Sequence, residues 1–425
     1  MTKENVEIHY GKEILTLEVN TAALKYNLLP VDLETVDDIH SETKRALSNP
    51  VNSDRLHKLV KKDQKVVVLV DDLTRLTPAR EILPHVLDEI NRGGVPDEDI
   101  ILIIALGTHR PMTREEIVQK YGNEVMDRVK IINHDCLDMK NLLHFGTTRR
   151  GTDIWVNKQV VEADVRIGVG NIVPHHPTGW SGGAKILLPG VAGELTTGQF
   201  HLLGATEQLL GQIETPCREE MEDFAAATGF DFIINSVLDR HGRVVRLVAG
   251  DIIAAHREGV KWGKRVFGAP FSVKTDITLS STYPVDYDLF QADKGLFSAA
   301  ISTRKGGEII LLSPCYEGIS PTHPEAIDLA HLSDEVLYRL ARDPDHAHDP
   351  LSIAEVLYFN SAKQGYKITL VSDGISEEIA RKLNFNHLAV SRLQQYLDQR
   401  LTEGLTLGII HHSAETLPVE QSPPT

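Results

Sequence analysis

Short runs of β-branched and aliphatic residues recur along the chain, separated by longer amphipathic stretches. Seven such runs lie at residues 66–70, 100–105, 165–169, 277–279, 308–312, 367–371 and 405–410. Continuous apolar runs of this length predict strands that are buried on both faces. Residues 80–92, closed by Gly93-Gly94, and 115–121, behind a capping-box pattern at Thr113, predict helices. The alternation predicts an α/β fold with mainly parallel sheets.

The length of 425 residues suggests two domains, at about 100–200 residues per domain. A helical stretch near 251–265 and a loop at 267–271 precede a fresh series of strands. We therefore predict an N-terminal α/β domain over residues 1–270 and a C-terminal α/β domain over 271–412. Residues 413–425 contain three prolines and few apolar groups, which predicts a flexible tail.

Composition narrows the classes of function. The chain carries 60 acidic and 44 basic side chains, a formal charge of −16, so a nucleic-acid partner is not expected. Its three cysteines form no Cys-x-x-Cys pair, which suits a reducing compartment. The first residues contain no secretory signal, and the longest apolar run is far below the roughly 20 residues that cross a bilayer. We expect a cytoplasmic protein with no membrane contact.

In open α/β sheets, ligands bind beyond the carboxyl ends of the strands, and two loops after predicted strands carry polar groups. The loop 71–78 holds Asp72, Thr74, Arg75 and Thr77 before a predicted helix, which indicates either an anion site or an ordinary capping turn. The loop Gly107-Thr108-His109 offers an imidazole that can exchange protons near neutral pH, or a surface histidine without function.

A third segment, residues 168–204, is rich in glycine and histidine and is too long for an idle connection. Ser181-Gly182-Gly183 offers backbone amides for a phosphate, and Lys185 adds a cation or a nucleophile. The segment is not a Walker loop, because alanine precedes the lysine and isoleucine follows it. The spacing of the nearby histidines fits no common zinc motif.

The motifs that stand out are, in chain order, Asp72-x-x-Arg75 with Thr77-Pro78, Gly107-Thr108-His109, Pro174-His175, Ser181-Gly-Gly-Ala-Lys185 with Pro189-Gly190, His201 and Gln291-Ala-Asp-Lys294. This ordered set resembles the nickel-dependent lactate racemase family. The resemblance spans nearly the whole chain.

The resemblance implies a nickel-pincer nucleotide, a pyridinium-3,5-bisthiocarboxylic acid mononucleotide that grips nickel (Ni) through two sulfur arms. By motif match, Lys185 is the lysine that attaches it covalently, and His201 is the single protein ligand of the nickel. One imidazole suffices because the pincer supplies the other three donor atoms in a plane. The N-terminal domain would bind the cofactor, with candidate contacts at Asp72, Thr74, Arg75, Thr77, Ser181, Gly182 and Gly183. Separate cofactor-biosynthesis enzymes are implied as partners.

The implied activity is racemisation of a 2-hydroxy acid by reversible hydride transfer to the cofactor. Because each enantiomer presents its hydroxyl on a different side, two bases are needed, and the resemblance assigns them to His109 and His175. Arg75 and Lys294 would hold the substrate carboxylate with Gln291 as a companion. Lys294 belongs to the second predicted domain, so we expect the active site in the interdomain cleft.

Phe359 and Trp180 are expected near the substrate, in a surround bulkier than lactate requires. Lactate is the first choice of substrate, and a larger 2-hydroxy acid such as malate, an aromatic acid or a sugar acid is the alternative. Two other classes of protein stay open: a phosphate-binding metal hydrolase that uses His175, His176 and His201, and a non-catalytic sensor of a phosphorylated metabolite.

Overall fold

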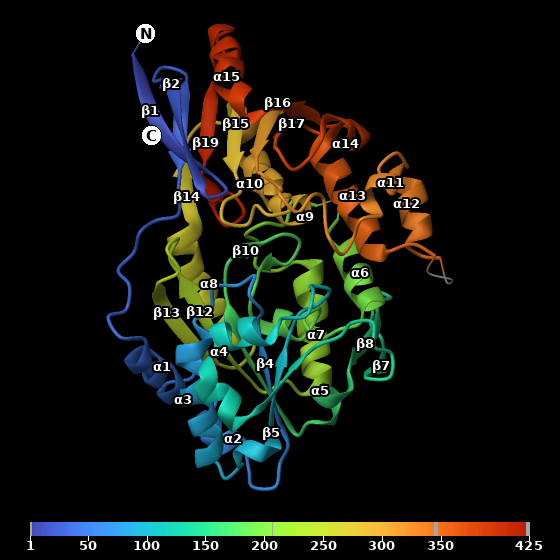
Figure 1. The fold of residues 1–425 in the computed structure, drawn as a ribbon. Coiled ribbons are helices and arrows are strands. Elements are labelled where there is room, and N and C mark those ends of the chain that lie inside the picture. Colours follow the sequence, from blue (N-terminus) through green and yellow to red (C-terminus); the bar gives the residue numbers. More distant parts are fainter. Residues whose placement is uncertain (1, 206, 344–346, 422–425) are drawn as a thin grey trace.

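The computed structural model describes residues 2–205, 207–343 and 347–421. The chain forms two lobes, and each lobe is built around a six-stranded sheet (Figure 1). Among the described residues, no helix is both long enough and apolar enough to cross a membrane.

The first sheet joins strands from the first 250 residues. In spatial order its strands are β13 (Val244–Gly250), β12 (Phe232–Leu238), β9 (Val165–Asn171), β4 (Val66–Val70), β5 (Ile100–Ile104) and β6 (Lys130–Asn133). All neighbours pair in parallel except β12 and β13, which are antiparallel. The α/β fold with mainly parallel sheets is therefore confirmed.

Helices cover both faces of this sheet, as the side chains of β4 show. Val66, Val68 and Val70 belong to the core beneath α1 (Ile39–Ser48), α3 (Ala79–Arg92) and α4 (Arg114–Arg128). Val67 and Leu69 point the other way, toward α7 (Pro216–Thr228). Both hydrogen bonds of the capping box between Thr113 and Glu116 are present, and this box begins α4 as predicted.

The remaining elements of this lobe are short or flank the sheet. They are α2 (Leu56–Leu59), η1 (Asp97–Asp99), β7 (Leu142–Thr147), β8 (Asp153–Asn157), α5 (Lys158–Glu162), β10 (Pro174–His175), β11 (Gly179–Trp180), η2 (Gly183–Ile186), α6 (Glu194–Leu202) and α8 (Ala254–Phe267). Four of them, β10, β11, η2 and α6, lie in the segment 168–204 that the sequence marks as functional.

The second sheet is parallel throughout. In spatial order its strands are β18 (Asn386–Leu388), β17 (Lys367–Val371), β16 (Thr303–Leu312), β15 (Thr275–Ser281), β19 (Leu407–Ile410) and β3 (Leu24–Leu28). On one face Ile309 and Leu311 pack beneath α10 (Lys294–Ser302) and α13 (Pro350–Lys363). On the other face Ile310 and Leu312 pack against α15 (Leu393–Thr402) and the hairpin of β1 (Lys3–Tyr10) and β2 (Glu13–Asn20).

Four short helices and one 3-10 turn complete this lobe. They are α9 (Leu289–Ala292), α11 (Ala326–Leu329), α12 (Asp334–Leu340), α14 (Glu377–Lys382) and η3 (Val390–Arg392).

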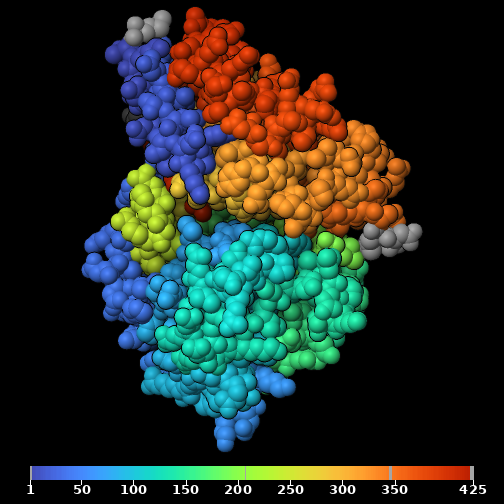
Figure 2. All heavy atoms as spheres, in the orientation of Figure 1, coloured from blue at the N-terminus to red at the C-terminus, as the bar shows by residue number. Residues whose placement is uncertain are grey.

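The beginning of the chain belongs to the second lobe. Strand β3 pairs with β19 at the edge of the second sheet, and in Figure 2 the blue N-terminal residues lie beside the red C-terminal part. The predicted domain limit of 1–270 is therefore wrong at its N-terminal end. A five-residue edge strand such as β3 carries no pattern that specifies which sheet it joins.

The predicted flexible tail is wrong for residues 413–420. The Ser413 hydroxyl is buried and accepts a hydrogen bond from Ser280 at 2.8 Å. Beyond it, β20 (Leu417–Glu420) pairs in parallel with β14 (Gly268–Phe271). Because proline is tolerated at such an edge, the prolines of this segment do not exclude a strand, and a flexible tail does not follow from them. Residues 422–425 of the predicted tail lie outside the described residues.

Candidate active site

A cavity between the lobes brings most of the predicted site residues together. Its walls come from the loops that follow β4, β5 and β9 in the first lobe and from α9, α10 and α13 in the second. The predicted residues that line it are Asp72, Thr74, Arg75, His109, His175, Ser181, Gly182, Lys185, His201, Gln291 and Lys294. The cavity lies at the carboxyl ends of parallel strands, where α/β sheets bind ligands.

Four predicted residues are placed elsewhere. Phe359 is buried in the core of the second lobe, where its ring packs edge-on against Phe385. Trp180 is fully buried in the first lobe, and its indole donates to the Gly211 carbonyl at 2.9 Å. The Thr77 hydroxyl is buried and donates to Asp71. The Gly183 amide donates to Asn235 Oδ1 at 2.8 Å, so it is not free for a phosphate.

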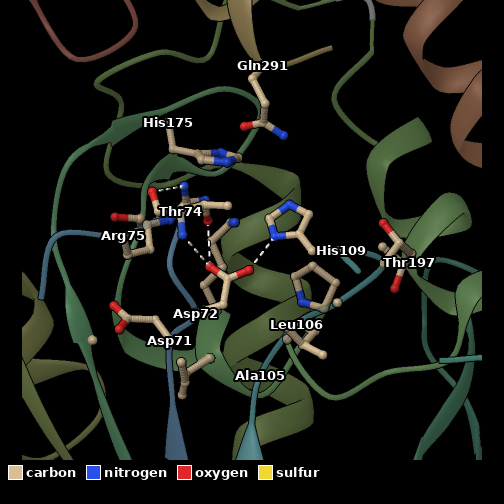
Figure 3. Close-up of a pocket in the computed structure, with 18 of the residues that line it drawn as sticks. Asp71, Asp72, Thr74, Arg75, Ala105, Leu106, His109, His175, Thr197 and Gln291 are labelled. Carbon is tan, nitrogen blue, oxygen red and sulfur yellow. Dashed lines mark hydrogen bonds and ion pairs between the residues drawn. The ribbon is translucent and has the colours of Figure 1, made fainter. Parts of the chain in front are cut away.

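Asp72 and His109 form a hydrogen-bonded pair. Asp72 Oδ2 accepts from His109 Nδ1 at 2.7 Å, and its Oδ1 accepts from the Thr74 amide and hydroxyl at 3.0 and 2.6 Å. Figure 3 shows Asp72 between these two partners. The contact with His109 is the largest influence that holds the pKa of Asp72 low despite burial. Because the carboxylate accepts at Nδ1, the His109 Nε2 carries the lone pair.

His175 is held in the same tautomer by a different partner. The Thr178 hydroxyl donates its single proton to the Trp180 carbonyl at 2.9 Å, so it accepts from His175 Nδ1 at 3.2 Å. Burial, reinforced by the nearby Lys185 and Lys294, lowers the pKa of His175 well below its usual range. A neutral imidazole with a free Nε2 is therefore the form at neutral pH.

His201, on α6, is held in the same tautomer, with its proton on Nδ1. Its Nδ1 donates to the Thr197 carbonyl at 2.7 Å, one turn earlier in the helix. Burial lowers the pKa of His201 to about 4, so the ring is neutral and its Nε2 is an available ligand atom.

Lys185 sits behind two glycines with left-handed backbone. The φ angles are 74° at Gly182 and 59° at Gly183, and a Cβ on Gly182 would lie 2.7 Å from Ile172 and 2.9 Å from the Asn171 carbonyl. Only glycine allows the backbone at position 182 to pack this closely against Ile172 and Asn171. Burial, with help from Arg75 and Lys294, lowers the pKa of the Lys185 amine well below its usual range. Burial therefore favours the uncharged amine, which is the nucleophilic form.

The loop after β4 is anchored by a buried lysine that the sequence did not single out. Lys120, on α4, donates to the carbonyls of Arg75 and Thr77 at 2.5 and 3.0 Å and lies 3.6 Å from Asp71. The Thr74 hydroxyl is committed to Asp72. Within the described residues, the Arg75 guanidinium donates only to the Thr74 carbonyl, at 3.3 Å, so it is the group of this loop that is free to bind an anion.

The second lobe contributes a cation surrounded by acids. The Lys294 ammonium donates to Gln291 Oε1. Burial lowers the pKa of Lys294 and, in the same pocket, raises those of Asp288, Asp293 and Glu355. One cation among three buried carboxyls keeps part of the acid set protonated.

Helix α13 adds residues that the sequence reasoning missed. Leu351, Glu355 and Tyr358 line the cavity, and their spacing of four and then three residues places them on one helix face. Tyr358 takes the place expected for Phe359, and its hydroxyl donates to the His201 carbonyl at 2.9 Å. The helical spacing in the sequence was the signal that could have identified this face.

The histidines expected by the metal-hydrolase alternative do not form a cluster. Among the described residues, three potential ligand atoms lie within 4.8 Å of one another in Glu194, His323 and Asp349 rather than in the histidines of the cavity. The His176 ring stacks on Phe297, with centroids 3.6 Å apart, and neither of its nitrogens has a partner there. The geometry therefore gives no support to a three-histidine zinc site.

Two α/β lobes with mainly parallel sheets, and a cavity between them lined by lysine, arginine and histidine side chains, define a two-domain α/β protein with a candidate active site between its lobes. Residues 10–210 match the model of the lactate racemase N-terminal domain. The chain belongs to the lactate racemase family, a family of isomerases. Its lactate racemase relatives from Lactiplantibacillus plantarum and Thermoanaerobacterium thermosaccharolyticum are 31% and 30% identical, each over 74% of this chain and 75% of the relative.

Solved structures agree with this assignment. The lactate racemase apoprotein from Thermoanaerobacterium thermosaccharolyticum superposes with a TM-score of 0.86 at 25% identity, covering 98% of this chain and all of that one. A Thermotoga maritima protein of the same fold gives a TM-score of 0.69 at 21% identity, covering 92% of this chain and all of that one. The resemblance drawn from the motifs is confirmed at the level of the family.

Proposed function

We propose that the protein racemises a 2-hydroxy acid, with His109 and His175 as the two acid–base residues. One observation carries the proposal: two histidines from different loops line one cavity, and each has Nδ1 tied to a partner and Nε2 free. Family membership and the lactate racemase relatives support the same reaction class.

The two histidines move the hydroxyl proton. In each direction one ring starts neutral and the other starts as an imidazolium: Nε2 of the neutral ring takes the proton from the substrate hydroxyl, and Nε2 of the imidazolium returns its proton when the hydroxyl forms on the opposite side. The tie at Nδ1 keeps each ring in the tautomer that can accept a proton. Asp72 also stabilises the imidazolium that forms on His109.

The substrate carboxylate is held from both lobes. Arg75 offers a planar fork from the first lobe, and Lys294 offers an ammonium from the second, with Gln291 beside it. Holding the carboxylate fixed allows the other end of the substrate to turn between the two histidines. A cavity between two lobes also limits access of water to the reacting carbon.

The residues present fit the nickel-pincer nucleotide that the family generally uses. Lys185 has a buried amine with a lowered pKa that can form an amide, and His201 has a neutral imidazole whose Nδ1 donates to Thr197 and whose Nε2 is available as a ligand. When bound, this cofactor would supply a reversible hydride acceptor beside the substrate carbon. In this proposal Lys185 attaches the cofactor covalently and His201 binds its nickel.

The test uses protein co-expressed with the cofactor-biosynthesis enzymes. Intact-protein mass spectrometry is expected to show a nucleotide-sized adduct at Lys185, metal analysis to show nickel, and chiral chromatography to show racemisation of a 2-hydroxy acid. His109→Asn and His175→Asn are expected to lose racemisation and keep the adduct.

A histidine outside the cavity supplies the matched control. His331 is exposed in the second lobe, where its Nδ1 lies 2.8 Å from the Asp328 carbonyl, so His331→Asn is expected to keep activity. Full activity in His109→Asn or His175→Asn would contradict the assigned role. Ligand binding without turnover and without an adduct would favour the metabolite sensor instead.

A further inference from the structure

One carboxyl group in the cavity wall has no role in the reaction described above. Glu355, on α13, is 1% exposed and lines the cavity, and among the described residues its Oε1 has no hydrogen-bond partner. A buried polar atom without a hydrogen-bond partner destabilises the folded protein. Such an atom in a cavity wall points to a ligand group that completes it.

Among the described residues, none of the neighbours of Glu355 makes a hydrogen bond with its Oε1. The Lys294 ammonium donates to Gln291, and the Tyr358 hydroxyl, one turn along the helix, donates to the His201 carbonyl. Leu351, one turn in the other direction, is apolar. A group bound in the cavity can therefore supply the partner of Glu355 Oε1.

The surroundings define what that partner is. Burial raises the pKa of Glu355 well above its usual range, and Asp293 and Asp288 raise it further. Burial therefore favours the protonated carboxyl, which offers one donor and one acceptor side by side. A hydroxyl group matches both. A methyl group matches neither, and a second carboxylate would be repelled by the same acids.

We propose that Glu355 binds a hydroxyl on C3 of the substrate, so that the preferred substrate is a 2,3-dihydroxy monocarboxylic acid or a longer polyhydroxy acid. The proposal rests on the proposed function, because it names the substrate class of the same site. With the substrate carboxylate on Arg75 and Lys294, C3 is the atom that carries the side chain, and Glu355 approaches from the lobe that also contributes Lys294.

Glycerate and lactate test this directly, because they differ only by the hydroxyl on C3. With cofactor-loaded protein, kcat/KM for glycerate is expected to exceed that for lactate by about 100-fold or more, since a site built for a hydroxyl discriminates strongly against its absence. Glu355→Gln keeps a donor and an acceptor and is expected to retain most of this ratio. Glu355→Met has a similar shape without them and is expected to bring the ratio close to one.

Binding gives a second measurement that does not depend on turnover. Calorimetry on the same three proteins is expected to show tighter binding of glycerate than of lactate, with the difference lost in Glu355→Met. Equal kcat/KM for the two acids in the unaltered protein, or a ratio that Glu355→Met leaves unchanged, would overturn the proposal. Loss of the Lys185 adduct in Glu355→Met with retention in Glu355→Gln would also overturn it, since Glu355 would then contact the cofactor.

These outcomes separate the two proposals. Absence of racemisation of either acid by loaded protein contradicts the proposed function, while the calorimetric preference still decides the role of Glu355. Racemisation of lactate in preference to glycerate supports the proposed function and refutes the role of Glu355.

Discussion

Asp72→Asn is expected to stop racemisation by forcing His109 into the wrong tautomer. Two donors of Thr74, its amide and its hydroxyl, converge on Asp72 Oδ1 at 3.0 and 2.6 Å. In the asparagine variant the amide oxygen must therefore take this position, because an NH2 group there would face two donors. The NH2 then faces His109 Nδ1 and can only donate to it, so the ring proton moves to Nε2.

The size of the effect follows from the lost proton transfer. A positioned general base contributes about 10²–10⁴-fold to the rate, so kcat/KM is expected to fall by this factor, or about 3–5 kcal/mol in the barrier. Since the equilibrium constant of a racemisation is one, kcat/KM must fall equally for both enantiomers. The loss of the Asp72 charge beside the imidazolium acts in the same direction.

The assay is chiral chromatography of initial rates from each pure enantiomer, with loaded protein. The adduct at Lys185 and the melting temperature serve as controls, because the side chain of Asp72 and that of asparagine have nearly the same shape. A value of kcat/KM within threefold of the unaltered protein, with adduct and stability unchanged, would refute the tautomer argument.

Three further variants test the surroundings of the site. In protein made without cofactor, Lys185→Met is expected to raise the free energy of unfolding at pH 7. Burial lowers the pKa of Lys185 in the folded protein, so folding releases a proton at pH values below the unfolded pKa of about 10.4. The stability of the unaltered protein therefore falls as the pH drops below that value. The free energy of unfolding, measured by denaturation at several pH values, is expected to depend less on pH in Lys185→Met. Its slope should fall by up to about 1.4 kcal/mol per pH unit. Phe359→Ala, in the core against Phe385, is expected to cost about 3–5 kcal/mol in chemical denaturation while kcat/KM stays within threefold. Thr108→Val removes the bond between Thr108 Oγ1 and His323 Nε2, 3.1 Å across the lobes, and keeps the 2.9 Å contact of His323 Nδ1 with Asp349, so KM is expected to rise about 2- to 12-fold with little change in kcat; a fall in kcat alone would contradict that role.

The fold was largely predictable because its strands are continuous apolar runs. Residues 66–70 and 367–371 are strands with the predicted limits, and the capping box at Thr113 fixed a helix start. The two errors lie at the chain ends, in β3 and β20. Both are short strands at an edge, and their partners, β19 for β3 and β14 for β20, lie far away in the sequence and are determined by packing rather than by local pattern.

The candidate site was predictable where a motif fixes a residue, and less so where packing decides. Lys185 and His109 lie in loops that the sequence identifies by glycine and by position after a strand. Phe359 was misplaced by one residue, since a step of 100° along α13 exchanges a cavity-facing side chain for a core side chain, and Tyr358 lines the cavity instead. Glu355 was missed because a lone glutamate in a helix normally indicates an exposed position.

The distribution of roles between the lobes explains why both lobes are needed. Both histidines and Lys185 come from the first lobe, whereas Lys294 and Glu355 come from the second. A small movement of one lobe against the other therefore changes the grip on the substrate and leaves the distance between the two bases unchanged. The site can release a product without disturbing the hydrogen bonds that set each tautomer, because the ties at Nδ1 of His109 and His175 lie within the first lobe. Variants at the contact between the lobes should accordingly raise KM, and variants that remove the hydrogen bonds at Nδ1 of His109 or His175 should lower kcat.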